Sequence, residues 1–412
     1  MINWMKLAIR NVLRNKRRSL VTLLAIGVGF AAVSLFYGYV SYMYYGLRVS
    51  AIRGEGLGNL TIFKAGWNEK GKLEPEKYML SKKETERIMK IVAAEDGVVV
   101  ATPQIHVSGI VSNGTASTIF IAQGVVPKDE KVIKGAWADF RPVKGKTLDD
   151  KVSYGVEVGQ DLARYLGFTP GTDGVVMATT LGGQMNAMDI LVNGVYDTGS
   201  DATNDKYMRC TFDFAQSLVD TTSAERIVVL LKDWKQTEAM RTELLNRLSK
   251  AGIQVEIKTW NELSLFYNKV RGMFDMIFLF LFSIVLVIVI MSTVNTMGMA
   301  VLERTREIGT LRALGLKRRG VSFIFALEGG LLGLFGSIIG IFLHVIVWGA
   351  IKLISPTYTP PGVSTPVPLV VDLVPHFLFI LVVCLVGLSL LAAIIPARRA
   401  ARQNVVDALG HV

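Results

Sequence analysis

The stretch MIFLFLFSIVLVIVIMSTVNTMGMAVL at residues 276–302 runs directly into ERTREIGTLRALGLKRR at residues 303–319. The first part contains no charged residue, and an α-helix of about 20 apolar residues is long enough to cross roughly 30 Å of hydrocarbon. The second part is rich in arginine and lysine, which concentrate on the cytoplasmic side of membrane proteins. Together the two parts predict a transmembrane helix that ends in a basic cytoplasmic segment.

Three further uncharged stretches have the length of a membrane span: residues 19–47, 329–351 and 373–397. The first is longer than the apolar core of a signal peptide, about 7–15 residues, and no small-residue cleavage site follows it, so we expect a permanent anchor. The composition agrees, because 51% of the residues are hydrophobic and only 19% are charged, against about a quarter charged in soluble domains. We therefore expect an α-helical membrane protein with four transmembrane helices. The first two long runs exceed the bilayer thickness, so these helices either tilt or project as a stalk.

The distribution of charge predicts the orientation of the chain. Residues 48–269 hold 28 basic and 28 acidic residues, so the net charge of +11 lies entirely in the segments that flank the apolar runs. Basic residues cluster before the first run, between the second and third, and after the fourth, whereas residues 355–372 contain none. By the positive-inside rule both termini and residues 303–320 are cytoplasmic, and residues 48–270 are periplasmic in a bacterial inner membrane. This location of the charge excludes nucleic-acid binding.

The expected order of segments follows. We predict a cytoplasmic amphipathic helix at 1–18, transmembrane helices at 19–47, 271–302, 321–354 and 373–396, a cytoplasmic helix or loop at 303–320, an extracytoplasmic loop at 355–372 and a cytoplasmic tail at 397–412. In residues 48–270 strands and helices alternate, which predicts a large α+β domain with a mostly β insertion at about 103–222. The strands are expected at 59–65, 98–102, 105–111, 118–122, 175–180, 189–195, 225–231 and 254–258, and the helices at 81–94, 158–166 and 236–250.

Few residues suggest chemistry. The four histidines, His106, His344, His376 and His411, are widely separated and lack the spacing of metal ligands. The two cysteines exclude a disulfide framework, and Cys210 is expected to be a buried free thiol. Gly145-Lys146-Thr147 resembles the end of a phosphate-binding loop, but position 140 is Phe where that loop needs Gly. We therefore expect no catalytic residue, no metal site and no bound cofactor, so that energy has to come from a partner.

Residues 303–315 form a short amphipathic pattern. A helix there places Ile308, Leu311 and Leu314 on one face, and Gly315 is a plausible C-cap. Pattern alone leaves two interpretations open, an ordinary basic loop and a helix that another protein pushes.

Three cytoplasmic segments resemble one family. Residues 303–315 are similar to the corresponding loop of the FtsX/MacB/LolC-LolE group of ABC transporter permeases. Pro396-Ala-Arg-Arg-Ala-Ala-Arg402 with Val405-Val406-Asp407-Ala408-Leu409 resembles the family's C-terminal pattern, except that Val405 stands where Pro is usual. Asn11-Val-Leu-Arg14-Asn-Lys-Arg-Arg18 resembles its N-terminal pattern. Topology and domain size agree, so the resemblance covers the whole chain, loosely in the external domain.

The resemblance implies mechanotransmission. In that family the 303–315 loop is a coupling helix seated in a separate cytoplasmic ATPase dimer, which binds ATP and Mg. The residues that correspond to it here are Glu303, Arg304, Arg306, Glu307, Ile308, Leu311, Arg312, Leu314 and Gly315. The family also implies a porter-like α/β part in the external domain and a second permease copy or paralogue. Length and domain size favour the LolC/LolE-like branch, which moves lipoproteins or lipids from the outer leaflet to a periplasmic carrier. The alternatives are MacB-like efflux of macrolides or peptides with an adaptor, and FtsX-like regulation of a cell-wall hydrolase.

Two features of the third predicted span, residues 321–354, have more than one interpretation. Glu328 either belongs to a proton relay or, as we favour, pairs with a basic residue or packs between helices near the inner interface. Gly329, Gly333, Gly336 and Gly340 form a small-residue stripe that permits close helix packing. That stripe suits either a dimer interface or packing within the chain, against the second or fourth span.

Overall fold

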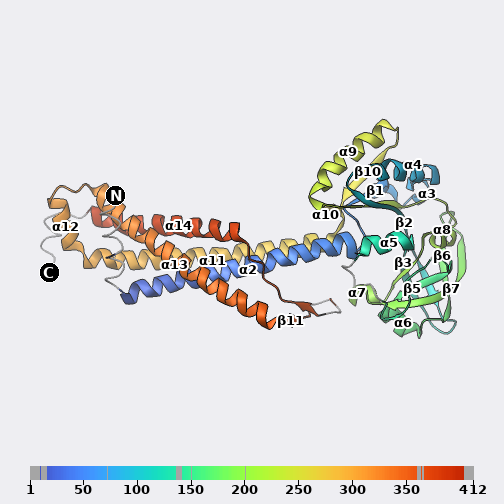
Figure 1. Cartoon of the computed structure of the whole chain (residues 1–412), viewed down its shortest axis with the longest axis horizontal. Helices are drawn as coiled ribbons and strands as arrows, with labels where there is room; N and C mark the ends of the chain where they lie inside the picture. The colour runs from blue at the N-terminus through green and yellow to red at the C-terminus, as the bar shows by residue number, and fades with distance from the viewer. Residues whose placement is uncertain are drawn as a thin grey trace. The chain divides into compact units, whose positions relative to one another are not determined.

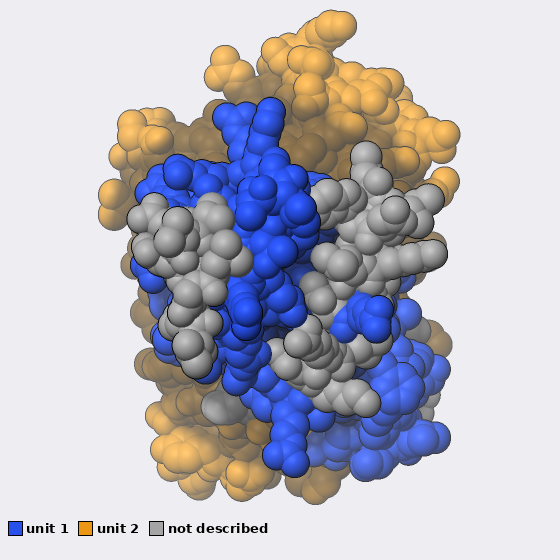
Figure 2. Space-filling model, turned by 90° about the vertical axis from the view of Figure 1, so that its left-hand side faces the viewer, with its two compact units in different colours: residues 1–44, 270–357, 368–412 blue, residues 45–269, 358–367 orange. Residues whose placement is uncertain are grey.

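The computed structural model describes residue 10 and residues 16–71, 73–135, 142–149, 151–199, 201–359, 363 and 366–402. The helix expected at 1–18 and the C-terminal residues 403–412 therefore lie wholly or mostly outside the described residues. The chain divides into two compact units (Figures 1 and 2). Unit 1 comprises residues 1–44, 270–357 and 368–412, and unit 2 comprises residues 45–269 and 358–367.

Unit 1 is a bundle of long apolar helices (Figure 1). They are α2 (Lys16–Val49), α11 (Leu265–Glu303), α13 (Arg318–Ile354) and α14 (Pro375–Ala401), and a short helix α12 (Thr305–Ala313) joins α11 to α13. Among the described residues, these four long helices are long and apolar enough to cross a membrane. The prediction of four transmembrane helices is confirmed. A two-stranded hairpin, β11 (Thr357–Tyr358) and β12 (Val367–Pro368), lies between α13 and α14.

The glycine stripe of α13 packs within the chain. A Cβ added at Gly329 or Gly333 would meet Ala393 or Ser389 of α14. A Cβ added at Gly336 or Gly340 would meet Ile26 or Phe30 of α2. The glycines thus bring α13 close to both neighbours, which supports packing within the chain; a dimer interface at these four residues stays a prediction. The sequence predicted packing against the second or the fourth span. Gly329 and Gly333 do pack against the fourth span, α14, but Gly336 and Gly340 pack against the first span, α2.

The first lobe of unit 2 is an antiparallel sheet covered by two helices. Its strands β1 (Leu60–Lys64), β9 (Arg226–Leu231), β10 (Val255–Thr259) and the first half of β2 (Val98–Ser112) pair in the order β10-β1-β9-β2. Helices α4 (Lys82–Ala93) and α9 (Thr237–Lys250) contribute Ile88, Val92, Leu244 and Leu248 to the core beneath it. The predicted start of α4 is confirmed, because Ser81 and Glu84 form a reciprocal capping box.

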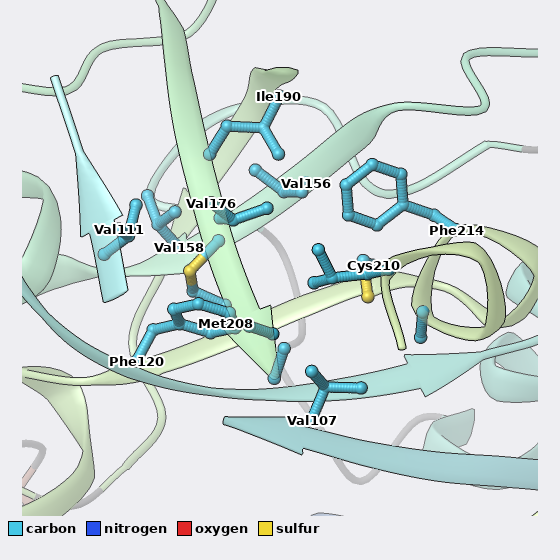
Figure 3. Close-up of a cluster of buried hydrophobic side chains, with 14 of the residues drawn as sticks. Val107, Val111, Phe120, Val156, Val158, Val176, Ile190, Met208, Cys210 and Phe214 are labelled. Atoms are coloured by element: carbon cyan, nitrogen blue, oxygen red, sulfur yellow. The ribbon is translucent and has the colours of Figure 1, made fainter. Parts of the chain in front are cut away.

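The insertion lobe, residues 103–222, is mostly β as expected. The second half of β2 pairs with β3 (Ser117–Val125) and β6 (Asp173–Thr179), and β6 pairs with β7 (Met185–Tyr196). β8 (Tyr207–Thr211) runs parallel to β3, and β5 (Gly155–Gly159) runs parallel to β7; β4 (Lys144–Gly145) is the edge strand beside β7. Helices α5 (Pro127–Lys134), α6 (Gln160–Leu166), α7 (Asp201–Asn204) and α8 (Phe212–Leu218) connect these strands. Val111, Phe120, Val176 and Ile190 form its core together with Met208 and Cys210 (Figure 3). Cys210 is 2% exposed and free, which confirms a buried thiol.

Two element predictions were wrong. The strands expected at 98–102 and 105–111 are one strand, β2, which continues through Pro103. Along residues 98–104 its ladder partner is β9, and from Ile105 it is β3, so the proline lies where the strand changes partners and a missing N–H is tolerated. The helix expected at 158–166 begins only at Gln160, because Gly155–Gly159 is a buried strand with β-branched residues.

Candidate coupling segment and the buried ion pair behind it

Helix α12 has clear boundaries. The backbone of Arg304 (φ −115°) separates it from α11. At the other end Gly315 has φ +97°, its N–H donates to the Arg312 carbonyl at 3.0 Å, and the Leu316 N–H donates to the Leu311 carbonyl at 3.0 Å. This pair of bonds is the Schellman arrangement, in which glycine carries the left-handed residue. The prediction that Gly315 ends the helix is confirmed.

The apolar residues of α12 and its C-cap residue, Leu314, do not share one environment. Ile308 is 5% exposed and packs with Met297, Val301 and Val321 of α11 and α13. Leu311 is 40% exposed and Leu314 is 81% exposed. Each step of three residues turns the helix about 60° short of a full turn, so the exposed leucines rotate progressively away from the buried face. The three residues therefore do not form the single apolar face that the sequence predicted. Ile308 packs into unit 1, whereas Leu311 and Leu314 face outward.

Arg304 and Glu328 form an ion pair behind α12. Arg304 Nη1 lies 3.1 Å from Glu328 Oε1 and 3.3 Å from Oε2, and the two side chains are 7% and 2% exposed. The expectation that Glu328 pairs with a basic residue is confirmed. Arg304 was predicted to be part of the coupling segment, and its guanidinium is directed into unit 1. It therefore joins the start of α12 to α13.

The N-terminal end of α2 and the C-terminal end of α11 are also joined by polar contacts. Arg18 Nη1 donates to Glu303 Oε1 at 2.8 Å, with both side chains well exposed. One turn further along, the hydroxyl oxygens of Thr22 and Thr296 lie 2.6 Å apart and are buried, and Ser292 donates to Thr22 at 3.3 Å. Glu303, another residue of the predicted segment, thus connects α11 to α2.

The remaining predicted residues lie at the surface of α12. Arg306 and Glu307 are exposed and Arg312 is half-buried. With Leu311 and Leu314 they form the outward surface of α12, at the end of unit 1 that faces the viewer in Figure 2. This surface combines charged groups with two exposed leucines.

The described residues show no group of three or more histidine, cysteine or acidic side chains that could hold a metal ion. His106 Nδ1 lies 2.9 Å from Glu225 Oε2, His344 Nδ1 lies 2.8 Å from Ser34 Oγ, and His376 is exposed. His411 lies outside the described residues. The sequence did not indicate which basic residue pairs with Glu328, because 24 positions separate the two partners.

The four apolar helices, the short helix α12 and the α+β unit 2 together define a class of protein. The chain is a polytopic membrane protein with a large domain outside its spans. Residues 279–405 match the family described as FtsX-like permease C-terminal. The uncharacterized ABC transporter permease MJ1507 of Methanocaldococcus jannaschii is 23% identical over 355 residues, 84% of each chain. The lipoprotein-releasing system transmembrane protein LolC of Neisseria meningitidis serogroup B is 24% identical over 342 residues, 79% of this chain and 81% of that one. Residues 279–405 therefore form an FtsX-like permease C-terminal domain, and over most of its length the chain is similar to permeases of ABC transporters.

A solved structure with a similar domain is the periplasmic region of MacB from Actinobacillus actinomycetemcomitans. The two chains are 16% identical with a TM-score of 0.38, and the match covers 51% of this chain and 92% of that one.

Proposed function

We propose that this chain transmits the motion of a separate cytoplasmic ATPase dimer to unit 2 in the periplasm. The observation that carries the proposal is the outward surface of α12, where Leu311 and Leu314 are exposed beside charged residues while Ile308 holds the helix to unit 1. Short helices with a few exposed apolar residues bind in grooves of partner proteins. The partner's ATP-driven closure then displaces α12, and no nucleotide has to bind this chain.

Motion of α12 reaches α2 and α11 through contacts inside unit 1. At the inner end, the Arg304–Glu328 and Arg18–Glu303 pairs join α12, α13, α11 and α2. Towards the outer end, the Tyr44 hydroxyl donates to Asp275 Oδ1 at 2.5 Å, and the rings of Phe36 and Phe278 stack with centroids 6.5 Å apart. Contacts at both ends favour α2 and α11 moving as a pair.

The same two helices belong to both units. The boundary at residues 44 and 45 falls inside α2, and the boundary at residues 269 and 270 falls inside α11. A continuous α-helix is hydrogen-bonded throughout, so a displacement at one end is carried along its axis. These helices are therefore the transmission elements of the proposed mechanism. The positive-inside rule supports a cytoplasmic location of the termini and α12, and a periplasmic location of unit 2.

The cargo we propose is a lipoprotein or a lipid taken from the outer leaflet of the inner membrane. The support is the similarity to LolC over 81% of that relative's length, which is greater than a shared core domain alone would give. In this proposal the cargo does not pass through the bundle, and a periplasmic carrier receives it. A second permease copy, or a paralogue, completes the complex.

The test is purification of the full chain from native membranes in mild detergent, followed by mass spectrometry and ATPase assays. We expect a stoichiometric ATPase with lipoproteins or a periplasmic carrier, and ATP-dependent release of lipoprotein after reconstitution into vesicles. Co-elution of a membrane-fusion adaptor or of a cell-wall hydrolase would replace lipoprotein release by the corresponding activity. Absence of any ATPase, under conditions that preserve a known ABC complex, would refute the coupling proposal itself.

A further inference from the structure

The outer end of α2 continues into a single π-helical turn, η1 (Ser50–Gly54). This turn contacts α5 of the insertion lobe. Arg53 Nη1 donates to the Ile133 carbonyl at 2.9 Å and to the Val132 carbonyl at 3.3 Å. A cation is favourable at the C-terminus of a helix, where carbonyls lack helical partners. Gly135 ends α5 with φ +54°, and a Cβ there would lie 2.7 Å from Arg53 Nη1, so glycine leaves room for the guanidinium.

Lys134 makes the reciprocal contact. Its ammonium donates to the Gly54 carbonyl at 2.6 Å and lies 3.3 Å from Glu130 Oε1. The Lys134 and Glu130 side chains are 6% and 7% exposed. Burial lowers the pKa of Lys134, and the carboxylate of Glu130 opposes that change. Two cations thus join the end of η1 to the end of α5. Arg53 of η1 binds carbonyls of α5, and Lys134 of α5 binds a carbonyl of η1.

The buried charges continue into the strands of the insertion lobe. Arg209 of β8 lies 3.6 Å from Glu130 Oε1 and forms an ion pair with Glu157 of β5. The guanidinium of Arg209 also lies over the Tyr196 ring of β7, 4.5 Å from its centroid. Arg209 and Glu157 are 3% and 2% exposed. Buried charges therefore lead from Lys134, beside the end of η1, to the strands β8 and β5, and the Tyr196 ring of β7 lies against Arg209. We call Arg53, Glu130, Lys134, Glu157 and Arg209 the ionic joint.

The first lobe is attached to the same helices differently. Ala51 and Ile52 of η1 pack with Leu230, Trp260 and Tyr267, an apolar cluster that includes the start of α11. Apolar packing is non-directional, whereas charge-assisted hydrogen bonds need defined geometry. The two lobes are also connected by β2, which runs from one lobe into the other. This strand changes its pairing partner beside Pro103. The chain returns to the first lobe after α8, at residues 219–225, so the contact at α5 is a further point that holds the insertion lobe.

We propose that Lys134 and Arg53 are positioning residues that make the insertion lobe follow the outer end of α2 during each ATPase cycle. This inference rests on the proposed function, and it adds that the first lobe and the insertion lobe receive motion through separate attachments. Removing the ionic joint leaves the apolar cluster intact, so the first lobe still responds when the insertion lobe no longer does.

The experiment is hydrogen–deuterium exchange of the full chain with its ATPase in lipid nanodiscs, with and without trapping by ATP and vanadate. Peptides from residues 173–190 report on the insertion lobe, and peptides from residues 237–250 report on the first lobe. The variants are Lys134→Met, the conservative Lys134→Arg, and Arg53→Met as a second route if Lys134→Met does not fold. Leu162→Ala is the matched control, because Leu162 is fully buried in the insertion-lobe core and outside the ionic joint.

In the wild type we expect trapping to change exchange in both sets of peptides. In Lys134→Met and Arg53→Met the trapping-dependent change in the insertion lobe is lost, that in the first lobe persists, and Lys134→Arg restores both. Leu162→Ala lowers protection in the insertion lobe in both states but keeps the difference between them. A full trapping-dependent change in the insertion lobe of Lys134→Met or Arg53→Met would overturn the joint and leave the proposed function intact. No change in either lobe of the wild type would overturn the proposed function and the joint with it.

Discussion

Arg304, at the start of α12, reaches Glu328 inside α13, and the Nη1–Oε1 distance is 3.1 Å with both side chains almost completely buried. The pair lies directly behind the exposed surface of α12. Its position explains why a charge inside an apolar helix is tolerated, because a buried carboxylate needs a charged or hydrogen-bonded partner. The ion pair thus adds an electrostatic contact to the packing of Ile308, and both hold α12 against unit 1.

The first prediction concerns this pair. Replacing one partner, in Glu328→Leu or Arg304→Leu, leaves the other charge buried and should destabilise the protein by about 3–5 kcal/mol. The double variant should recover much of that loss, because no uncompensated charge remains. The measurement is thermal unfolding of the full chain in detergent, followed by size-exclusion chromatography. Equal stability of the single and double variants would show that the two charges do not depend on each other.

The second prediction separates the contact surface of α12 from its anchor. Leu314→Asp should weaken ATPase binding by about 2 kcal/mol or more, the scale of an interface hot spot, and should leave thermal stability unchanged because Leu314 is 81% exposed. Glu307→Ala should uncouple ATP hydrolysis from cargo release without unfolding. Co-purification of the ATPase and coupled release report these effects.

Lys317→Ala is the control for α12, because Lys317 is exposed just beyond Gly315. It should retain both binding and coupling. If Leu314→Asp also retains them, α12 is not the ATPase contact.

The third prediction uses two glycines of one helix. Gly340→Ala should destabilise the bundle by about 1–3 kcal/mol, because its Cβ would overlap Phe30 of α2. Gly349→Ala, where no atom lies within 4 Å of the added Cβ, should be neutral or stabilising by up to about 1 kcal/mol. Thermal unfolding of both variants in the same detergent compares them. A neutral Gly340→Ala would mean that α13 and α2 are not in close contact.

This comparison also shows what could be predicted from sequence. The four spans and the small-residue stripe follow from composition and period, because apolar length and spacing are local properties. The partner of each glycine does not, since it depends on which helices become neighbours. The same limit applies to Glu328: its position in an apolar span predicted a basic partner, but not that the partner is Arg304. It also applies to α12, where residue spacing predicted one apolar face and packing buries only Ile308 of the three residues.

In unit 2 the capping box at Ser81 and the left-handed Gly167 that ends α6 are local features, because caps are formed by a few adjacent residues. Helix α5 was missed, although Pro127 at its first turn and acidic residues after it are a start signal. The ionic joint could not be predicted, because its five members come from η1, α5, β5 and β8 and only the tertiary fold brings them together.

The fourth prediction concerns the reactivity of Cys210. Burial raises the pKa of this thiol to about 12, so almost none is thiolate at pH 8, and thiolate is the reactive form. In a Cys384→Ser background, a maleimide should therefore label Cys210 only after denaturation. Full labelling of the native protein within minutes would contradict the buried position that Figure 3 shows.

The last prediction is a dependence of stability on pH through Glu225. Its Oε2 accepts from the His106 backbone N–H at 2.7 Å and lies 2.9 Å from His106 Nδ1, while Arg226 binds the other oxygen. Burial alone would raise the pKa of Glu225, but the charges of His106 and Arg226 outweigh it and hold the pKa well below its usual range. A carboxyl with a lowered folded-state pKa contributes fully above its unfolded value of about 4.3, and the contribution is lost as the pH falls below that value.

Glu225→Gln should therefore lower stability at pH 7 by about 1.5–3 kcal/mol, the range for hydrogen bonds to charged groups, and should flatten the decline of stability below about pH 4. Glu243→Gln is the control, because Glu243 forms an exposed ion pair with Arg247 on α9, and exposed pairs contribute little. Urea unfolding of residues 48–270, expressed alone as a soluble domain, gives both quantities across the pH range. A Glu225→Gln domain with the wild-type slope would show that another carboxyl governs acid unfolding, because the slope reports the difference in bound protons between the folded and unfolded states.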